Sequence, residues 1–208
     1  MDEVTRRFKN HYEHCFDTHG ATAKGADWRD TQTANMRYQQ MLKVIVDATT
    51  KASMLDVGCG FAGLLSYLKE QSLNIDYSGI DVAQNMLSHS RKTFPDNQFI
   101  EADILSHQFD CKYDYVVCNG ILTQKLTASQ SSMTAYMEKL IKTMFEISNI
   151  GIAFNIMTDR VNFKVDNLFY KSPEALIAFC LDNITRHIKI DHAYPMYEYT
   201  VYLYKEGV

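Results

Sequence analysis

The sequence predicts an α/β protein in which a largely parallel sheet is closed by an antiparallel hairpin. From residue 53 onward, short apolar runs alternate with amphipathic stretches of helical periodicity. This is the pattern of parallel strands connected by helices that cover both faces of a sheet. The last two β-rich runs, 184–192 and 197–205, are joined only by residues 193–196. Because so short a connection cannot cross a sheet, these two strands are expected to pair antiparallel.

Local patterns predict the individual elements of this sheet. Residues 53–57 form an apolar run that ends at Gly58, as a buried parallel strand does before its turn. Ser172 and Pro173 predict the start of a helix that runs through residue 181, with serine as the cap and proline in the first turn. Further strands are expected at 75–80, 98–100, 113–118 and 150–156, and helices at 63–70, 82–92 and 131–147.

Residues 1–50 read as a helical extension that precedes the sheet. A polar helix is expected over residues 2–16, followed by a loop at 19–28. A longer helix, capped by Thr31 or Thr33, is expected to continue through Ala48. No repeat or flexible linker divides the rest, so residues 51–208 are expected to form a single domain.

Composition excludes several classes of protein. The chain has 208 residues, 46% of them apolar, which is enough for a large core and argues against a disordered chain. Its formal net charge of −4 argues against a polyanion binder. No apolar run reaches the ~18 residues of a membrane span, and the polar start predicts no secretory signal. The five cysteines form no close pair, which favours reduced thiols and a cytoplasmic location.

A glycine-rich turn follows the first expected strand. Gly58, Gly60 and Gly63 match the spacing G-x-G-x-x-G, which lets the backbone pass close to a ligand at a helix N-terminus. Asp81 stands directly at the end of the second strand. A carboxylate in that position can accept hydrogen bonds from the two hydroxyls of a ribose. Together these residues predict a nucleoside site.

A second acidic residue discriminates between two kinds of nucleoside ligand. Asp56 lies two residues before Gly58, beside the turn. Its carboxylate would repel the pyrophosphate of a nicotinamide dinucleotide but attract the ammonium and sulfonium groups of S-adenosylmethionine. No second domain is present to carry hydride-transfer residues. Both observations favour the methyl donor over a nicotinamide cofactor.

Over residues 53–205 the sequence resembles the class I S-adenosylmethionine-dependent methyltransferases. The family's glycine motif matches residues 55–63, its ribose-binding acid matches Asp81, and its adenine-contacting turn matches 101–104. Residues 113–120 match the segment that follows its fourth strand. The resemblance implies a doubly wound, Rossmann-like seven-stranded sheet in the order 3-2-1-4-5-7-6, with the last strand antiparallel. It also implies S-adenosylmethionine as donor and S-adenosylhomocysteine as product.

The resemblance further implies a set of donor-binding residues. Gly58 and Gly60 would approach the methionine part, with Asp56 near its amino group. Asp81 would hold the ribose, and Asp103 would accept from the exocyclic amine of adenine. The other residues expected to contact the donor are Cys59, Val82, Met86, Ala102, Ile104 and Asn119.

The methyl acceptor is expected beyond the carboxyl ends of the strands. The extension is expected to serve as a lid, from which Trp28 and Arg37 reach the site and Arg37 pairs with the donor carboxylate. Tyr12, His19 and Asn119 are the candidate catalytic residues, with His11, His14 or His19 as a general base if the accepting atom must lose a proton.

Two other kinds of site are not expected. His11 and Cys15 lie one helical turn apart, but no further ligand follows at usable spacing, so no metal site is predicted. Asn119 is followed by Gly120-Ile121-Leu122, whereas methyltransferases of nucleic-acid amines usually carry prolines and an aromatic residue there. This difference argues against a nucleic acid as acceptor.

These observations predict a cytoplasmic, metal-independent methyltransferase, monomeric or homodimeric, without membrane attachment. It would transfer a methyl group from S-adenosylmethionine to an oxygen or nitrogen of a small molecule by direct displacement. Two alternatives remain at this stage: an NAD(P)-dependent oxidoreductase, and a catalytically silent module that binds S-adenosylmethionine.

Overall fold

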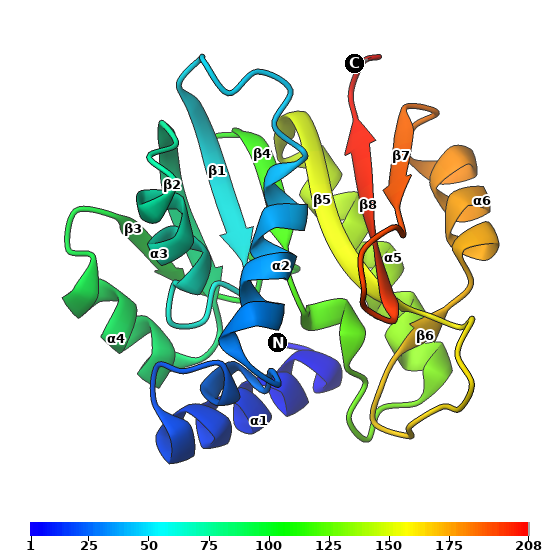
Figure 1. Cartoon of the computed structure of the whole chain (residues 1–208), viewed down its shortest axis with the longest axis horizontal. Helices are drawn as coiled ribbons and strands as arrows, with labels where there is room; N and C mark the ends of the chain where they lie inside the picture. The colour runs from blue at the N-terminus through cyan, green and yellow to red at the C-terminus, as the bar shows by residue number, and fades with distance from the viewer. Residues whose placement is uncertain (208) are drawn as a thin grey trace.

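A computed structural model describes residues 1–207 and shows a mixed sheet at the centre of the molecule (Figure 1). The strands lie in the order β3-β2-β1-β4-β5-β8-β7, and the short β6 pairs with β5 beside this path. The strands are β1 (Ala52–Val57), β2 (Ile75–Asp81), β3 (Gln98–Glu101), β4 (Tyr113–Cys118), β5 (Ser148–Thr158), β6 (Tyr170–Lys171), β7 (Ile188–Asp191) and β8 (Glu198–Tyr204).

The expected topology is confirmed. Strands β3, β2, β1, β4 and β5 are parallel, whereas β8 runs antiparallel to both β5 and β7. The order is therefore the expected 3-2-1-4-5-7-6, because β7 and β8 are the sixth and seventh long strands of the chain. The two-residue strand β6 was not expected, since so short a segment carries no periodicity.

Helices connect the strands and precede the sheet. They are α1 (Glu3–His19), α2 (Thr31–Leu42), α3 (Gly63–Glu70), α4 (Gln84–Thr93), α5 (Gln130–Glu146) and α6 (Pro173–Asn183), with single 3₁₀ turns η1 (Lys24–Ala26) and η2 (Ile121–Thr123). Ser172 caps α6 as expected, accepting a hydrogen bond from the backbone N–H of Ala175. Within residues 1–207, no helix is both long and apolar enough to cross a membrane.

The prediction for α2 was wrong at both ends. Asp30, rather than Thr31 or Thr33, caps the helix and accepts a hydrogen bond from the N–H of Thr33. The helix ends at Leu42 instead of continuing through Ala48. Residues 47–50 instead form a turn in which Asp47 accepts from the N–H of Thr49, and this turn brings the chain back to the start of β1.

The sheet separates two hydrophobic cores. On one face, apolar side chains of α5 and α6 pack with Leu55 and Val57. On the other, α2 and α3 pack with Ala52 and Met54. Alternate residues of β1 therefore face opposite cores, as the period of two along a strand requires. Both cores leave the carboxyl ends of the parallel strands free for a ligand.

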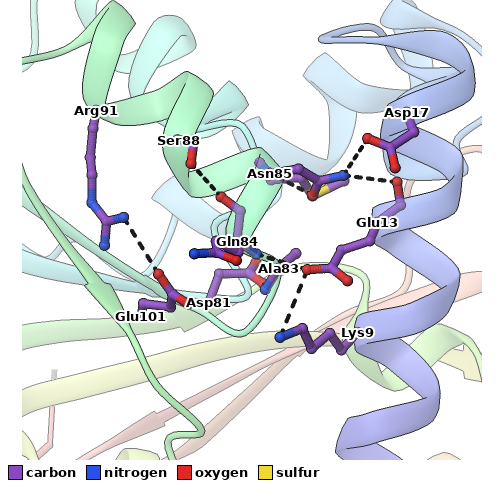
Figure 2. A network of polar contacts seen from close by, with 11 residues as sticks. Lys9, Glu13, Asp17, Asp81, Ala83, Gln84, Asn85, Ser88, Arg91 and Glu101 are labelled. Atoms are coloured by element: carbon purple, nitrogen blue, oxygen red, sulfur yellow. Dashed lines mark hydrogen bonds and ion pairs between the residues drawn. The ribbon is translucent and has the colours of Figure 1, made fainter.

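Helix α1 lies across these carboxyl ends, below the tip of β1 in Figure 1. Polar contacts hold its C-terminal half against the start of α4 (Figure 2). The Glu13 carboxylate accepts from the backbone N–H of Gln84 at 3.0 Å, and the Asn85 amide donates to the Glu13 carbonyl and the Asp17 carboxylate. Nearer its N-terminus, Val4 and Phe8 join the core formed with α5. The helix thus covers the edge of the sheet where an α/β ligand site is expected.

Candidate functional site

A cavity lies between the carboxyl ends of β1, β2 and β4 and helix α1. Its empty space, counted together with open solvent at its mouth, amounts to about 950 Å³. Its walls come from the glycine turn after β1, the ends of β2 and β3, and the segment after β4. Its roof comes from α1 and from Ala26 and Trp28. Most of the lining is apolar.

The glycine turn forms the floor of this cavity. Gly58 and Gly60 have φ angles of +73° and +52°, which L-residues with a side chain rarely adopt. A Cβ on Gly58 would also lie 2.5 Å from Cδ1 of Ile121. The N–H of Gly58 donates to the carbonyl of Ile80 at 2.8 Å, which ties the turn to β2. Backbone conformation therefore favours glycine at both positions, and at Gly58 a side chain would also displace Ile121.

Asp81 joins the two turns that border the cavity. One carboxylate oxygen accepts from the N–H of Gly60 and the other from the N–H of Ala83, each at 2.8 Å. Burial raises the pKa of this carboxyl, whereas these backbone donors oppose the shift. Each carboxylate oxygen can accept more than one hydrogen bond, so both retain capacity for a ligand.

Asp56 is a second carboxyl in the same wall and is more deeply buried than Asp81. It is 3% exposed and accepts a hydrogen bond of 2.8 Å from the phenol of Tyr77. Burial raises its pKa to about 7, and the neighbouring Asp81 adds to the rise, while the Tyr77 phenol lowers it. A carboxyl with this pKa gains or loses its proton near neutral pH, and a cationic ligand would favour the ionised form.

Asn119 projects a buried amide at the end of β4. It lines the cavity, and neither polar atom of its side chain has a hydrogen-bond partner within residues 1–207. Buried polar groups are rarely left unpaired. The next peptide is held by Asn155, whose carbonyl oxygen accepts from the N–H of Gly120 at 2.8 Å. The amide of Asn119 is thus held in place while its own hydrogen-bonding atoms stay free for a ligand.

Arg37 does not enter the cavity, contrary to the sequence-based expectation. Its Nε lies 2.9 Å from Oε1 of Glu198, and its guanidinium stacks 5.3 Å from the ring of Trp28. The other oxygen of Glu198 accepts from the Asn155 amide. A guanidinium engaged in this buried pair is not placed to meet a donor carboxylate. Arg37 instead contacts Trp28, which lines the cavity, and Glu198, which also accepts from Asn155.

His19 also lies outside the cavity, because it is exposed at the C-terminal end of α1. Tyr12 does line the cavity, and burial raises the pKa of its phenol far above the neutral range. The structure brings together all the other residues predicted for the site: Trp28, Asp56, Gly58, Cys59, Gly60, Asp81, Val82, Met86, Ala102, Asp103, Ile104 and Asn119.

Several lining residues were not predicted from the sequence. Phe8 stands four residues before the predicted Tyr12 on α1, a spacing that places both on one face and could have indicated Phe8 as part of the roof. No local pattern predicts that Tyr38 on α2 and Tyr136 on α5 line the cavity, because both residues are far from the motifs along the chain. The remaining unpredicted residues are Thr5, Lys9, Ala26, Val57, Phe61, Leu64, Ile80, Ala83 and Ile121.

The doubly wound sheet, the glycine turn and the carboxylate at the end of β2 define a nucleoside-binding α/β protein. Residues 55–144 match a family described as a methyltransferase domain. The chain is 30% identical over 164 residues to a Mycobacterium tuberculosis protein named as methyltransferase Rv1506c, covering 77% of this chain and 98% of that protein. The chain therefore belongs to the class I S-adenosylmethionine-dependent methyltransferases, whose methyl donor is S-adenosylmethionine.

Solved structures show the same fold. Magnesium protoporphyrin IX methyltransferase from Synechocystis PCC 6803, solved with bound S-adenosylmethionine, superposes with a TM-score of 0.59 at 14% identity, covering 83% of this chain and 81% of that one. The amino pentose methyltransferase CalS10 from Micromonospora echinaspora gives 0.58 at 13% identity, covering 84% and 91%. At these identities the likeness extends to the fold alone.

The pairing of Arg37 with Glu198 gives a stability prediction. Arg37→Met leaves the buried Glu198 carboxylate without its cation, and loss of one partner of a buried pair costs about 3–5 kcal/mol. Urea unfolding at neutral pH measures this loss. Arg37→Met combined with Glu198→Gln should recover most of it, because the unpaired charge is then absent.

Lys43→Met is the matched control for this prediction. It removes the cation of the more exposed pair between Lys43 and Asp191, so its cost should stay within about 1 kcal/mol. An Arg37→Met protein no less stable than the Lys43→Met protein would contradict the assignment of a buried pair.

Proposed function

We propose that this chain transfers a methyl group from S-adenosylmethionine to an oxygen or nitrogen of a small molecule. The observation that carries the proposal is the roofed cavity, in which α1 and Trp28 lie opposite the glycine turn. A small acceptor fits a site enclosed in this way better than a polymer does. The largely apolar lining favours an acceptor with substantial apolar surface.

The buried carboxyls suit the donor's charge and hydrogen-bonding groups. Asp56, beside the glycine turn, would receive the ammonium of the methionine part. Asp81, at the end of β2, would accept hydrogen bonds from the ribose. Asp103 is buried where the cavity meets the end of β3, and its carboxylate also accepts from the N–H of Leu105 at 3.0 Å. It would face the exocyclic amine of adenine.

The reaction is a direct displacement, and the main catalytic contribution of the protein is to align the acceptor atom with the methyl group of the donor. The acceptor's lone pair forms the new bond to the methyl carbon, and the electrons of the broken carbon–sulfur bond remain on sulfur, which becomes a neutral thioether. Orientation alone can supply about 7–11 kcal/mol. Of the three predicted catalytic residues, His19 lies outside the cavity, the Tyr12 phenol stays protonated near neutral pH, and the Asn119 amide is too weak a base to take up a proton.

Asn119 and Tyr12 therefore act by hydrogen bonding rather than as general bases in this proposal. The free amide of Asn119 can both donate to and accept from a bound ligand. The Tyr12 phenol can donate from the roof. A proton released by the acceptor would leave to solvent after methyl transfer.

Turnover against two classes of acceptor tests the proposed function. Release of S-adenosylhomocysteine should be detected by mass spectrometry with at least one hydroxyl- or amine-bearing small molecule from a chemically diverse panel. It should stay at background with RNA, DNA and protein. Transfer to a polymer alone would overturn the small-molecule assignment, and donor binding without turnover on any acceptor would favour a silent binding module.

The proposed ribose contact predicts weaker donor binding when Asp81 loses its charge. Asp81→Asn keeps a carbonyl oxygen for one backbone N–H, but it removes the charged carboxylate that would accept hydrogen bonds from the ribose. The binding free energy of S-adenosylhomocysteine should therefore weaken by about 1.5–3 kcal/mol. Titration calorimetry measures the change. Glu101→Gln is the control, because Glu101 pairs in register with Asp81 but is exposed and outside the lining. Equal affinities of Asp81→Asn and wild type would refute the contact.

The raised pKa of Asp56 predicts pH-dependent donor binding. The ammonium of the donor binds the ionised carboxylate, which predominates only above a pH of about 7. Affinity for S-adenosylhomocysteine should therefore rise about tenfold per pH unit below 7 and level off above it. Calorimetry between pH 5.5 and 7.5, at constant ionic strength, measures this profile; these two limits are about 1.5 units below and 0.5 above the pKa.

Two variants separate Asp56 from other titrating groups. Asp56→Asn should bind weakly with a flat profile over the same range. Tyr77→Phe removes the hydrogen bond that favours the ionised form, so it should move the inflection to higher pH. A profile that Asp56→Asn leaves unchanged would assign the titration to a different residue.

A further inference from the structure

Three potential metal ligands meet beside the cavity, between α1 and the segment that leads to α2. They are an imidazole nitrogen of His11, the thiol of Cys15 and the carboxylate of Asp27, whose ligand atoms all lie within 4.8 Å of one another. Nε2 of His11 is 2.8 Å from Oδ2 of Asp27 and 3.7 Å from Sγ of Cys15. None of the three lines the donor cavity, and the proposed methyl transfer uses none of them.

The spacing of these atoms fits a tetrahedral zinc ion. With Zn–N, Zn–O and Zn–S bonds of usual length, neighbouring ligand atoms lie about 3.4–3.6 Å apart. The observed separations of 3.7 Å and 2.8 Å fall on either side of this range. Small side-chain rotations would equalise them. The side chains of His11 and Cys15 can reach the same ion without a change of the backbone, because residues four apart lie on one face of a helix.

The surroundings hold the ligands in place but leave them accessible. Asp27 has a left-handed backbone (φ 57°) that ends η1, and the Gln124 amide donates to its Oδ2 at 3.1 Å. Such outer contacts orient metal ligands in known sites. His11 and Cys15 are half-buried and Asp27 is exposed, so an ion can enter from solvent. One thiolate, one imidazole and one carboxylate suit zinc better than magnesium or calcium.

We propose that His11, Cys15 and Asp27 bind a divalent cation of the zinc type, with water as the fourth ligand. The sequence-based expectation of no metal site considered spacing along the chain only. Asp27 lies twelve residues beyond Cys15, and the turn around Gly20 and η1 brings it back to α1.

The ion would link two parts of the cavity roof. Tyr12 is the chain neighbour of His11, while Ala26 and Trp28 flank Asp27, and all three of these neighbours line the cavity. A cation bound between α1 and Asp27 fixes these lining residues relative to each other. Metal and donor affinities are then coupled, and each changes the other by the same factor. The role is regulatory or structural, because no ligand faces the reacting atoms.

Cobalt titration of the full chain, without methyl donor, tests the site. Co²⁺ should bind with one-to-one stoichiometry and give a thiolate-to-cobalt charge-transfer band, which Zn²⁺ then displaces. His11→Gln, Cys15→Ser and Asp27→Asn should each weaken Zn²⁺ binding by at least about tenfold, since even outer-shell changes cost that much. Cys15→Ser should also abolish the band. Gln124→Ala should weaken binding about 10–100-fold with the band retained.

Cys111→Ser and His14→Gln are the controls, since both residues are exposed and lie outside the cluster. Both should bind Zn²⁺ as the wild type does. Circular dichroism and metal-free S-adenosylhomocysteine binding show whether each variant is folded. Absence of one-to-one binding, a band that persists in Cys15→Ser, or a band that disappears in Cys111→Ser would overturn the proposal. Because the readout is spectroscopic, its failure leaves the proposed methyl transfer untouched.

Discussion

The carboxylate of Asp81 is the contact on which the geometry of the site depends. It satisfies one backbone N–H from the glycine turn and one from the turn that starts α4. These turns follow neighbouring parallel strands, and without a common acceptor each would present an unpaired N–H to the cavity. Burying a carboxyl is costly unless it is well hydrogen-bonded. The same side chain therefore supports the floor of the cavity and retains acceptor capacity toward a ligand.

Charge is distributed unevenly between the two sides of the site. The buried Asp56 and the half-buried Asp81 place acidic groups in the wall beside the glycine turn, whereas the half-buried cation Arg37 packs on Trp28 and is paired with Glu198. The acidic wall therefore favours a positively charged ligand. The sulfonium and ammonium groups of the methyl donor carry that charge. The aromatic rings of Trp28 and Tyr38, 5.5 Å apart, supply the complementary apolar side.

Local patterns predicted the long strands of the sheet and its closing hairpin, from apolar runs and connection lengths, whereas the strand order followed from the family resemblance. Most of the residues predicted to bind the donor line the cavity, because they belong to short motifs at the ends of the parallel strands. Arg37 was misplaced because its partner, Glu198, lies 161 positions away and no local pattern connects them. The end of α2 was misjudged because Ile45 and Ala48 continue the helical spacing of apolar residues, although the helix ends at Leu42 and Ala48 is exposed.

Helix α4 begins without a capping side chain of its own, since Ala83 occupies that position. The missing acceptor is supplied by Glu13, from a helix about seventy positions earlier in the chain. Moving α1 away would leave the first peptide N–H of α4 without this acceptor, so the position of α1 and the start of α4 are energetically linked. The place of α1 over the cavity is thereby set partly by the hydrogen-bonding requirement of a helix end.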